Sequence, residues 1–347
     1  MAEAVIGWDV GGAHLKAARI EAGRAVAALQ LPCPLWHGLD LLPAAIGTAL
    51  ERLGPAARHA ATMTGELADV FASRAEGVAH IARVLAEATG VATAPLIWAG
   101  RAGFLPARDA PAHAADVASA NWLATATLAA RAVPAGLLAD MGSTTTDLVP
   151  FAGGAPCPAG FTDAARMARG ELVYTGLVRS FVFALADRVP FAGAWTPLAG
   201  EYFATSADLY RLLGELPEAA DQMPAADGRD KTEAASRARL ARMVGCDAAD
   251  APTAAWRDLA AFLAEAQLRR IADAAMLVLS RMALPPEAPV IGAGCGRHVT
   301  RRLADRLGRP WRDFATLAPL KGLAPDVADQ CAPAVAVALL AAECPFP

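Results

Sequence analysis

The chain has 347 residues, of which 55% are hydrophobic and 19% are charged, and its formal net charge is −4 at pH 7. This composition excludes a disordered chain, and the length suggests two domains that each bury a core. The negative charge argues against a non-specific nucleic-acid binder, because that class relies on a positive field.

The same composition carries information about the compartment. No run of about 18 apolar residues is present, and the longest candidate, 332–342, is too short to span a membrane. No basic residue precedes the first apolar stretch, so a secretory signal is not predicted. The six cysteines are scattered without a CxxC pair, which argues against a zinc site or a disulfide scaffold. We therefore expect a soluble cytoplasmic protein with reduced thiols and no membrane segment.

The first part of the chain predicts a hairpin-rich start followed by alternating helices and strands. Apolar alternation and turn residues predict strands at 5–8, 15–20, 24–31, 59–64 and 94–99. Helical spacing covers 39–53 and 74–88. A further helix is expected over 116–132, capped by Asp116 and ended before Pro134.

The pattern then restarts. A strand at 136–139, a Gly/Ser/Thr turn at 140–146 and a strand at 147–151 copy the layout of residues 5–20, which suggests two related halves. Residues 217–231 form the main predicted loop. Helices are expected at 256–284, 299–307 and 326–344, with a short strand at 289–291.

Three glycine-rich turns each follow an apolar strand. Glycine lets the backbone turn sharply and present several N–H groups to one anion. One such turn is common in ordinary hairpins, but three together predict phosphate binding. The Walker A pattern is absent, and so is the Rossmann pattern after the first strand. The candidate phosphate-binding residues are Gly11, Gly12, Lys16, Gly142, Ser143, Thr144, Thr145, Thr146, Gly294 and Gly296.

Carboxylates accompany two of these turns. Asp9 and Asp147 could hold Mg²⁺, whose preference for oxygen ligands suits carboxylate and phosphate together. Lys16 could reach a phosphate oxygen, and a solvated lysine at a strand end is the alternative interpretation.

Asp-x-Gly-Gly in a first hairpin, Asp-x-Gly-Ser-x-Thr in a second, and a late Gly-x-Gly-x-Gly before a helix resemble the superfamily of acetate and sugar kinases, heat-shock chaperones and actin. The resemblance implies an α/β protein of two ribonuclease-H-like (actin-like ATPase) domains with an interdomain cleft. We place the domains at 1–133 and 134–347. The second carries a helical insertion, and the last helix is a candidate for packing back on the first domain.

Within that superfamily the chain is most similar to the hydantoinase/oxoprolinase-like branch. Five segments together resemble a narrower family of enzymes of methanofuran biosynthesis. These segments are DVGGAHLKAA, DMGSTTTDLVP, GELVYTG, EYFATSADLYRLLG and ADGRDK. Members of that family join an aminomethyl-furanmethanol diphosphate to the phenol of a glutamyl-tyramine, and relatives accompany tetrahydromethanopterin-linked one-carbon metabolism. His14 departs from the small polar amide expected at its position.

The resemblance implies a transferase that moves a furfuryl group and releases diphosphate, with Mg²⁺ as cofactor and small molecules as its partners. A glutamyl-tyrosine could replace the tyramine acceptor in a bacterial relative. Growing charge on the leaving diphosphate needs anion binding, and a phenol with a pKa near 10 benefits from a base. Asp9 and Asp147 are the candidates for metal ligand and base, and the sequence does not divide these roles.

Further residues are candidates for substrate contact. Glu171 and Tyr174 follow the second hairpin, where a substrate pocket is expected, although core packing is an alternative for Tyr174. Lys231 follows an Asp-Gly-Arg-Asp loop and could contact the acidic end of the acceptor or simply be solvated. His298 follows the third glycine turn. It could contact an anion at the start of a helix, and a surface residue is the alternative interpretation. Ser206 is expected to cap the helix that carries Asp208 and Tyr210.

Two other classes of function remain open. One is an ATP-dependent enzyme of the same fold, either a small-molecule kinase or a hydantoinase/oxoprolinase-type hydrolase, in which the third turn would hold adenosine. The other is a non-catalytic nucleotide-binding scaffold. ATP turnover would indicate the first class, and tight ATP binding without turnover would indicate the second.

Overall fold

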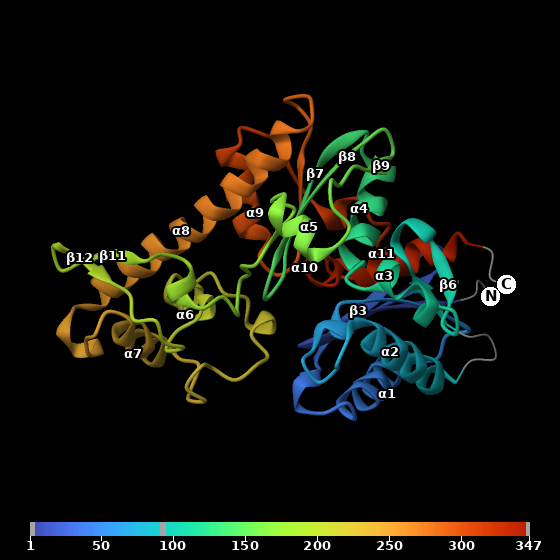
Figure 1. Cartoon of the computed structure of the whole chain (residues 1–347), viewed down its shortest axis with the longest axis horizontal. Helices are drawn as coiled ribbons and strands as arrows, with labels where there is room; N and C mark the ends of the chain where they lie inside the picture. Colours follow the sequence, from blue (N-terminus) through green and yellow to red (C-terminus); the bar gives the residue numbers. More distant parts are fainter. Residues whose placement is uncertain (1–3, 91–94, 345–347) are drawn as a thin grey trace. The chain divides into compact units, whose positions relative to one another are not determined.

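The computed structural model describes residues 4–90 and 95–344 (Figure 1). The predicted strand at 94–99 is found at Leu96–Trp98, and its first residue, Ala94, lies outside the described residues. The chain divides into two compact units. Unit 1 comprises Met1–Leu138, Val149–Pro158 and Arg312–Pro347, and unit 2 comprises Ala139–Leu148 and Ala159–Trp311. The predicted domains were consecutive, whereas these units are interleaved along the chain.

Unit 1 contains a six-stranded sheet of order β3-β2-β1-β4-β5-β6. The first three strands are antiparallel, and β1 runs parallel to β4, as β4 does to β5. Every residue of β1 is buried, as expected for a central strand covered on both faces. The strands are β1 (Val5–Val10), β2 (His14–Glu21), β3 (Arg24–Pro32), β4 (Arg58–Met63), β5 (Leu96–Trp98) and β6 (Phe104–Pro106).

Helices cover both faces of this sheet. On one face, α1 (Leu41–Leu53) and α2 (Arg74–Thr89) share a core with the alternate β1 residues Ile6, Trp8 and Val10. On the other, α11 (Ala332–Ala342) packs on β1 at Gly7, where a Cβ would overlap the backbone of Ala334. Alanine and glycine at this contact let the helix approach the strand closely, and α11 also packs on α4 (Asn121–Ala132).

Two single helices predicted for this unit are wrong. The region 116–132 forms α3 (Ala114–Val117) and α4, separated at Ser119, whose φ of 53° lies in the left-handed region. Asp116 therefore lies within α3 rather than capping a long helix. The region 326–344 forms α10 (Pro325–Gln330) and α11, because Pro333 has no N–H to continue the helix and instead begins α11.

The second sheet has the order β10-β8-β7-β13-β14, with β9 paired to β8. The boundary between the units crosses β7, β8 and β14. The strands are β7 (Ala135–Met141), β8 (Thr146–Ala152), β9 (Ala155–Pro156), β10 (Leu172–Val173), β13 (Val290–Ala293) and β14 (Trp311–Asp313).

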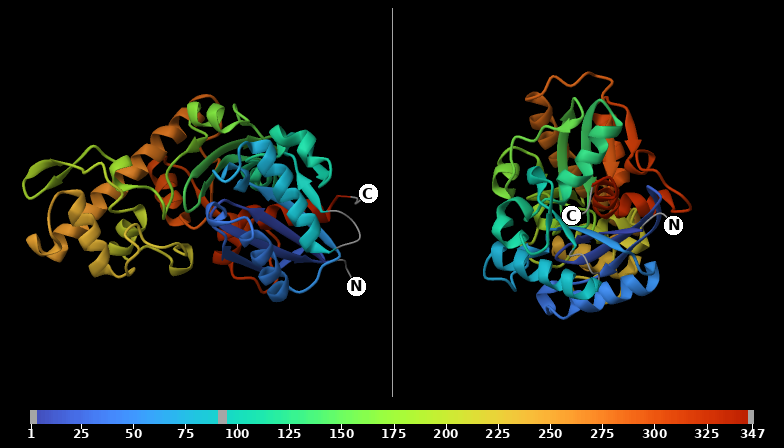
Figure 2. Two further views of the ribbon diagram at one scale, coloured as in Figure 1. Left: turned by 60° about the horizontal axis from the view of Figure 1, so that its bottom comes forward. Right: turned by 90° about the vertical axis from the view of Figure 1, so that its right-hand side faces the viewer.

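Unit 2 also contains a helical insertion. The long helix α8 (Thr253–Ser280), orange in Figures 1 and 2, packs on α6 (Ser206–Leu212), α7 (Glu233–Met243) and β11 (Arg188–Phe191). Its core includes Trp256 and Leu240. The remaining elements are α5 (Asp163–Ala168), β12 (Ala194–Pro197) and α9 (Arg297–Arg306), with short 3-10 turns at Leu35–His37, Gly65–Leu67, Gly100–Ala102, Ala110–His113, Val182–Ala184, Glu218–Ala220, Ala248–Asp250 and Phe314–Thr316. Across residues 4–90 and 95–344, no helix combines the length and apolarity needed to cross a membrane.

Candidate functional site

The two predicted hairpin turns share one backbone geometry. The Gly11 N–H donates to the His14 carbonyl at 2.9 Å, and the Gly142 N–H donates to the Thr145 carbonyl at 2.9 Å. Each bond closes a two-residue loop between antiparallel strands. The internal repeat predicted from the sequence is therefore confirmed at the level of hydrogen bonding.

In unit 1 the first hairpin brings Asp9 and Lys16 together. They lie directly opposite each other in the β1–β2 register, with Lys16 Nζ 3.6 Å from Asp9 Oδ2, and Asp9 is only 3% exposed. Burial raises the pKa of the nearby Cys331 thiol to about 12, while Lys16 lowers it and Asp9 raises it. The thiol therefore stays protonated at neutral pH, and the hairpin presents one buried carboxylate balanced by one cation. His14 is buried at the start of β2.

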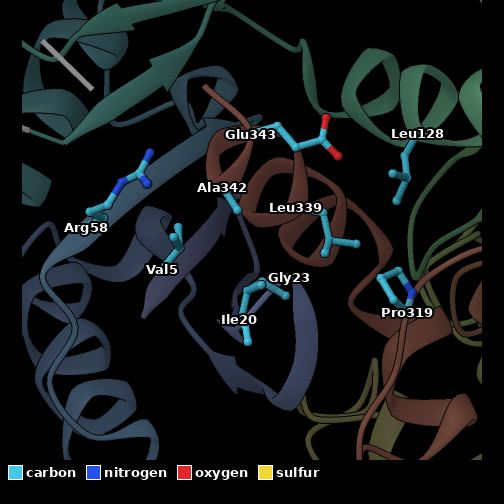
Figure 3. Close-up of a pocket in the computed structure, with 10 residues that line it drawn as sticks. Val5, Ile20, Gly23, Arg58, Leu128, Pro319, Leu339, Ala342 and Glu343 are labelled. Atoms are coloured by element: carbon cyan, nitrogen blue, oxygen red, sulfur yellow. The ribbon is translucent and has the colours of Figure 1, made fainter. Parts of the chain in front are cut away.

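A cavity in unit 1 lies away from this turn. It has a volume of about 340 Å³ and is lined at the start of β1 by Val5 and at the β2–β3 turn by Gly23 (Figure 3). Arg58 lines it as well, and its guanidinium donates to the Ala341 and Cys344 carbonyls at the end of α11. Asp9 lies towards the opposite end of β1, so this cavity is not part of the glycine-turn site.

In unit 2 the second and third glycine turns lie against each other. The Gly296 N–H donates to the Met141 carbonyl at 2.9 Å. A Cβ on Gly294, whose φ is +80°, would lie 2.5 Å from Asp140 Oδ1. Ser143 and Thr144 complete the second turn. The structure thus packs the third turn, at Gly294 and Gly296, against Asp140 and Met141, which directly precede Gly142.

A further glycine, Gly176, packs against the other side of the second turn. A Cβ on Gly176 would lie 2.5 Å from the Thr144 nitrogen and 2.7 Å from the Gly142 carbonyl oxygen. Thr146 differs from its neighbours, because it is fully buried and its hydroxyl donates to the Thr175 carbonyl at 2.8 Å. We therefore assign Thr146 to holding the strand rather than to binding phosphate.

The paired hairpins identify a residue that the sequence analysis did not select. Asp140 lies two residues before Gly142, just as Asp9 lies two residues before Gly11, and it is 8% exposed. Asp147 instead matches the position of Lys16. Superimposing the two Gly-turn patterns residue by residue, rather than seeking a carboxylate in each, would have found Asp140.

Asp147 is held by a buried cation. The guanidinium of Arg166 lies 2.8 Å from Asp147 Oδ1, and Arg166 is 1% exposed. The same guanidinium donates to the Glu171 carbonyl at 2.9 Å. These contacts engage Asp147 with a buried cation within unit 2. The structure therefore favours a structural role for Asp147 and places Asp140 beside the turn.

Glu171 is buried in a structural position. Its carboxylate accepts hydrogen bonds from the Ala159 N–H at 2.6 Å and the Gly160 N–H at 3.0 Å, and Arg281 lies 3.0 Å away. These bonds fix the loop before α5. The side chain is 1% exposed, which favours a structural role over the substrate contact expected for Glu171.

Tyr174 is 56% exposed, so the core-packing alternative is wrong for it. The segment after Tyr174 is hydrogen-bonded to the second turn. The backbone N–H groups of Val178 and Arg179 both donate to the Ser143 carbonyl, at 3.0 and 2.8 Å. Burial lowers the pKa of the Arg179 guanidinium, and Tyr174 acts in the opposite direction. The sequence analysis missed Arg179, and its position after GELVYTG was the signal that could have found it.

Buried hydrogen bonds from Gln267 and Tyr210 support the segment at Thr175 and Gly176. The Gln267 amide donates to Thr175 Oγ1 at 2.7 Å and to the Gly176 carbonyl at 2.8 Å. The Tyr210 hydroxyl donates to Gln267 Oε1 at 2.7 Å, and burial raises the pKa of that hydroxyl. Tyr210 is therefore a supporting residue rather than a substrate contact.

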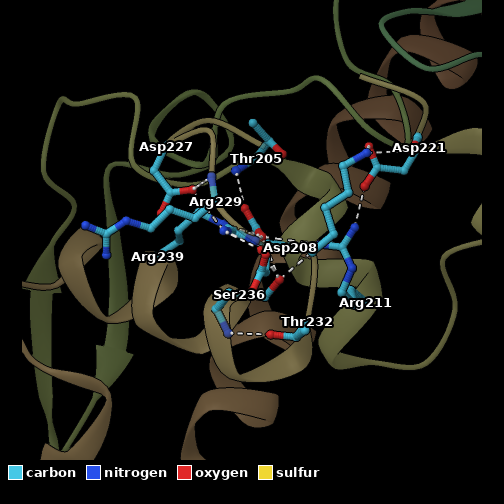
Figure 4. Close-up of polar contacts among 12 residues, drawn as sticks. Thr205, Asp208, Arg211, Asp221, Asp227, Arg229, Thr232, Ser236 and Arg239 are labelled. Carbon is cyan, nitrogen blue, oxygen red and sulfur yellow. Dashed lines mark hydrogen bonds and ion pairs between the residues drawn. The ribbon is translucent and has the colours of Figure 1, made fainter. Parts of the chain in front are cut away.

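Lys231 belongs to a second polar network, in which Asp208, Asp221 and Arg239 are labelled in Figure 4. Its ammonium donates to the Asp221 carbonyl at 2.7 Å and to Asp221 Oδ1 at 3.1 Å, and Arg211 also pairs with Asp221. The fully buried Arg239 donates to Asp208 Oδ1 at 2.8 Å and to Asp227 Oδ1 at 3.0 Å. This network ties the loop 217–231 to α6 and α7, and it engages Lys231 within the protein.

The start of α6 also differs from the prediction. The cap is Thr205 rather than Ser206, and the Thr205 N–H donates to Asp208 Oδ2 at 3.1 Å. Ser206 instead donates its hydroxyl to the Gly176 carbonyl at 2.9 Å. It therefore helps to position the glycine that closes the second turn.

His298 lies on the first turn of α9 and faces an acidic side chain. Its Nε2 lies 4.0 Å from Glu215 Oε2, and Arg302 forms two hydrogen bonds with that carboxylate, at 3.0 and 2.5 Å. Burial lowers the pKa of His298, and Glu215 opposes that effect. This arrangement favours a structural contact over the anion contact considered for His298.

Within the described part of the chain, no three His, Cys, Asp or Glu side chains gather as a metal cluster. Mg²⁺ in phosphate sites commonly takes only one or two carboxylates and completes its shell with phosphate and water. Asp140, buried at the start of the second turn, has the donor chemistry for such an ion. The residues of unit 2 therefore fit a phosphate-bound Mg²⁺.

Residues 58–314 match the family described as hydantoinase/oxoprolinase. The chain belongs to this family. It is 32% identical over 244 residues, 70% of this chain and 72% of the relative, to a Methanocaldococcus jannaschii protein named (4-{4-[2-(gamma-L-glutamylamino)ethyl]phenoxymethyl}furan-2-yl)methanamine synthase. A Methanococcus vannielii protein of the same name is 31% identical over 111 residues, covering 32% of this chain and 50% of the relative.

Solved structures agree with the fold of this family member. A nucleotide-free acetone carboxylase aligns with a TM-score of 0.60 and 11% identity, covering 89% of this chain and 68% of that one. An ethanolamine utilization protein from Carboxydothermus hydrogenoformans aligns with a TM-score of 0.50 and 10% identity, covering 98% and 90%. The predicted α/β class with two actin-like ATPase domains is confirmed.

Proposed function

We propose that this hydantoinase/oxoprolinase family member is an ether synthase that joins a furfuryl carbon to a phenol oxygen. The observation that carries the proposal is the relationship to the named synthase over 70% of the chain. The pair of mutually packed glycine turns in unit 2 supports it. The substrates are an aminomethyl-furanmethanol diphosphate and a glutamyl-tyramine or glutamyl-tyrosine, and the product serves a methanofuran-type cofactor.

The reaction exchanges one bond for another. The carbon–oxygen bond to diphosphate breaks and the electron pair leaves with the diphosphate, while the phenol oxygen bonds to the furfuryl carbon and its proton passes to a base. The furan oxygen stabilises positive charge on that carbon. The protein must therefore stabilise negative charge on the leaving group, which preorganised N–H donors do effectively in a water-poor site.

The unit 2 turn has the donors for this task. We assign the backbone N–H groups of Ser143, Thr144 and Thr145 and the hydroxyls of Ser143 and Thr144 to the diphosphate, because the Gly142 N–H is already donated to the Thr145 carbonyl. We also assign the Arg179 guanidinium to the diphosphate, since the backbone N–H of Arg179 donates a hydrogen bond to the Ser143 carbonyl. Gly176 and Gly294 keep both sides of the turn free of side chains, so the backbone stays in one conformation.

We assign the Mg²⁺ ligand in unit 2 to Asp140 and withdraw that role from Asp147. When bound, the ion would neutralise charge that grows on the departing diphosphate. Asp9 of unit 1, whose Oδ2 lies 3.6 Å from Lys16 Nζ, remains a candidate for the base that receives the phenol proton. The Asp147–Arg166 pair instead holds β8 to α5.

The experiment is to measure diphosphate release by the purified protein with Mg²⁺, the furan diphosphate and either phenolic acceptor, with the ether product followed by mass spectrometry. Acceptor-dependent release with matching ether formation supports the proposal. Phosphate release from ATP without ether formation would move the function to the kinase or hydrolase class. Tight ATP binding with neither reaction would indicate the nucleotide-binding scaffold.

A further inference from the structure

Three aromatic side chains form an exposed cluster in unit 2, which we call the aromatic face: Phe181, Phe183 and Tyr202. The ring centroids of Phe181 and Tyr202 lie 4.4 Å apart, and Phe183 lies 5.8 Å from the first and 5.7 Å from the second. Phe181 is 36% exposed and Tyr202 is 63% exposed. The three rings contact one another, and two of them leave ring surface open to a further aromatic ring.

The aromatic face is joined to the second glycine turn by a short, fixed backbone. The Arg179 N–H donates to the Ser143 carbonyl at 2.8 Å. Phe181 follows two residues later, so its Cα lies at most about 7 Å from that of Arg179. An isolated bridge between Phe181 and Thr205 anchors the face to the start of α6. The face and the turn therefore belong to one rigid arrangement within unit 2.

The burial pattern places Arg179 and the aromatic rings on the same side of this segment. Val178, Ser180 and Val182 are buried, whereas Arg179, Phe181 and Phe183 alternate with them and are more exposed. Alternation of this kind indicates an extended segment with one open face as far as Phe181, whose φ and ψ are −69° and 137°. Phe183 lies in the 3-10 turn Val182–Ala184 that follows, and its ring stacks on that of Phe181. The open face thus runs from a cation beside the glycine turn to a group of aromatic rings.

We propose that the aromatic face binds the aromatic ring of the phenolic acceptor and directs its oxygen towards the 142–145 turn. This inference rests on the proposed function and adds to it the residues that select the acceptor. Aromatic rings attract one another in tilted and offset arrangements, and the rigid side chains of Phe and Tyr lose little entropy on binding. Arg179 then lies between the acceptor ring and the diphosphate, where its charge favours the leaving group.

The size of the patch favours a small molecule over a second copy of the chain. A fully exposed Phe or Tyr offers on the order of 200 Å², so Phe181 and Tyr202 together expose on the order of 200 Å². A stable dimer buries about 800 Å² on each partner. The aromatic face supplies about a quarter of that area, which matches one or two aromatic rings.

The test is steady-state kinetics of diphosphate release with γ-glutamyltyramine varied, together with calorimetric binding of γ-glutamyltyramine alone. Phe181→Leu keeps an apolar side chain but removes the ring, and Tyr202→Phe keeps the ring but removes the hydroxyl. We expect Phe181→Leu and Tyr202→Ala to raise the KM and the dissociation constant for the acceptor about tenfold, with the KM for the furan diphosphate unchanged. Tyr202→Phe should behave as the wild type.

Trp195 provides the matched control, since it is an aromatic side chain of unit 2 with 57% exposure that lies outside the aromatic face. Trp195→Ala should leave the acceptor KM unchanged. If the wild type releases diphosphate and Phe181→Leu keeps the acceptor KM, the aromatic face is overturned while the proposed function stands.

The binding arm separates the remaining outcomes. Calorimetric binding that is lost in Phe181→Leu, without diphosphate release by the wild type, would support the aromatic face and reject the ether synthase. Absence of both binding and release in the wild type would overturn both proposals. A change of oligomeric state in Tyr202→Ala with an unchanged acceptor KM would make the face a contact between copies and overturn the inference.

Discussion

Gly176→Ala tests whether the conformation of the second glycine turn controls the reaction. The added Cβ would lie 2.5 Å from the Thr144 nitrogen, and ordinary contact begins at 3.4 Å. Backbone atoms cannot rotate out of the way, so the turn must move by about 0.9 Å to accept the methyl group. A displacement of about 1 Å in a group that positions a substrate costs on the order of 100-fold in rate.

The expected result is therefore a loss of about 100-fold in kcat/KM for diphosphate release. Overpacking of this kind costs about 1–3 kcal/mol of stability, which a urea unfolding curve measures. Gly200→Ala is the control in the same unit, because a Cβ there meets nothing within 4 Å, and it should change neither quantity appreciably. A Gly176→Ala protein with wild-type kcat/KM would refute the assignment of the 142–145 turn to the diphosphate.

Three further substitutions separate chemistry from stability. Asp140→Asn should lower kcat/KM at least 100-fold at saturating Mg²⁺, as steady-state kinetics would show, and its unfolding free energy, measured by urea titration, should fall less than that of Asp147→Asn. Asp147→Asn should lower the unfolding free energy by on the order of 3 kcal/mol in the same titration, because Arg166 would stay buried without the carboxylate that lies 2.8 Å away. If Asp147→Asn instead lost more activity and less stability than Asp140→Asn, the metal ligand would be Asp147. Burial lowers the pKa of His59 from 6.5 to about 4, so the unfolded chain binds the proton first as the pH falls. The stabilisation from the neutral ring is complete above about pH 6.5 and is lost between there and about pH 4, amounting to up to about 3 kcal/mol. His59→Gln should flatten that part of the stability–pH curve, and an unchanged slope would assign acid sensitivity to other groups.

Much of the fold could be predicted from the sequence, because the signals for strands, turns and helices are local. Strand alternation and turn glycines are local signals, since a residue's neighbours in the chain fix them. They placed β1, β2, α1 and α2 within about two residues. The helix breaks at Ser119 and before Pro333 were missed, because a periodic apolar pattern continues across both positions while one backbone torsion or one absent N–H ends the helix.

The sequence by itself determined the three glycine turns, the repeated hairpin and the chemistry that they offer, because glycine and hydroxyl residues act through a short stretch of backbone. Only the tertiary structure decided which carboxylate stands beside the second turn. Asp147 and Asp140 are both plausible ligands in one dimension, and Arg166 becomes the partner of Asp147 only when α5 packs beside β8. Likewise, the folded loop 217–231 places the Lys231 ammonium within hydrogen-bonding distance of Asp221. The Arg179 backbone N–H donates to the Ser143 carbonyl only in the folded chain. Charges that are distant in sequence are neutralised by whichever partner the packed fold brings within a few ångströms, and no local pattern records that pairing.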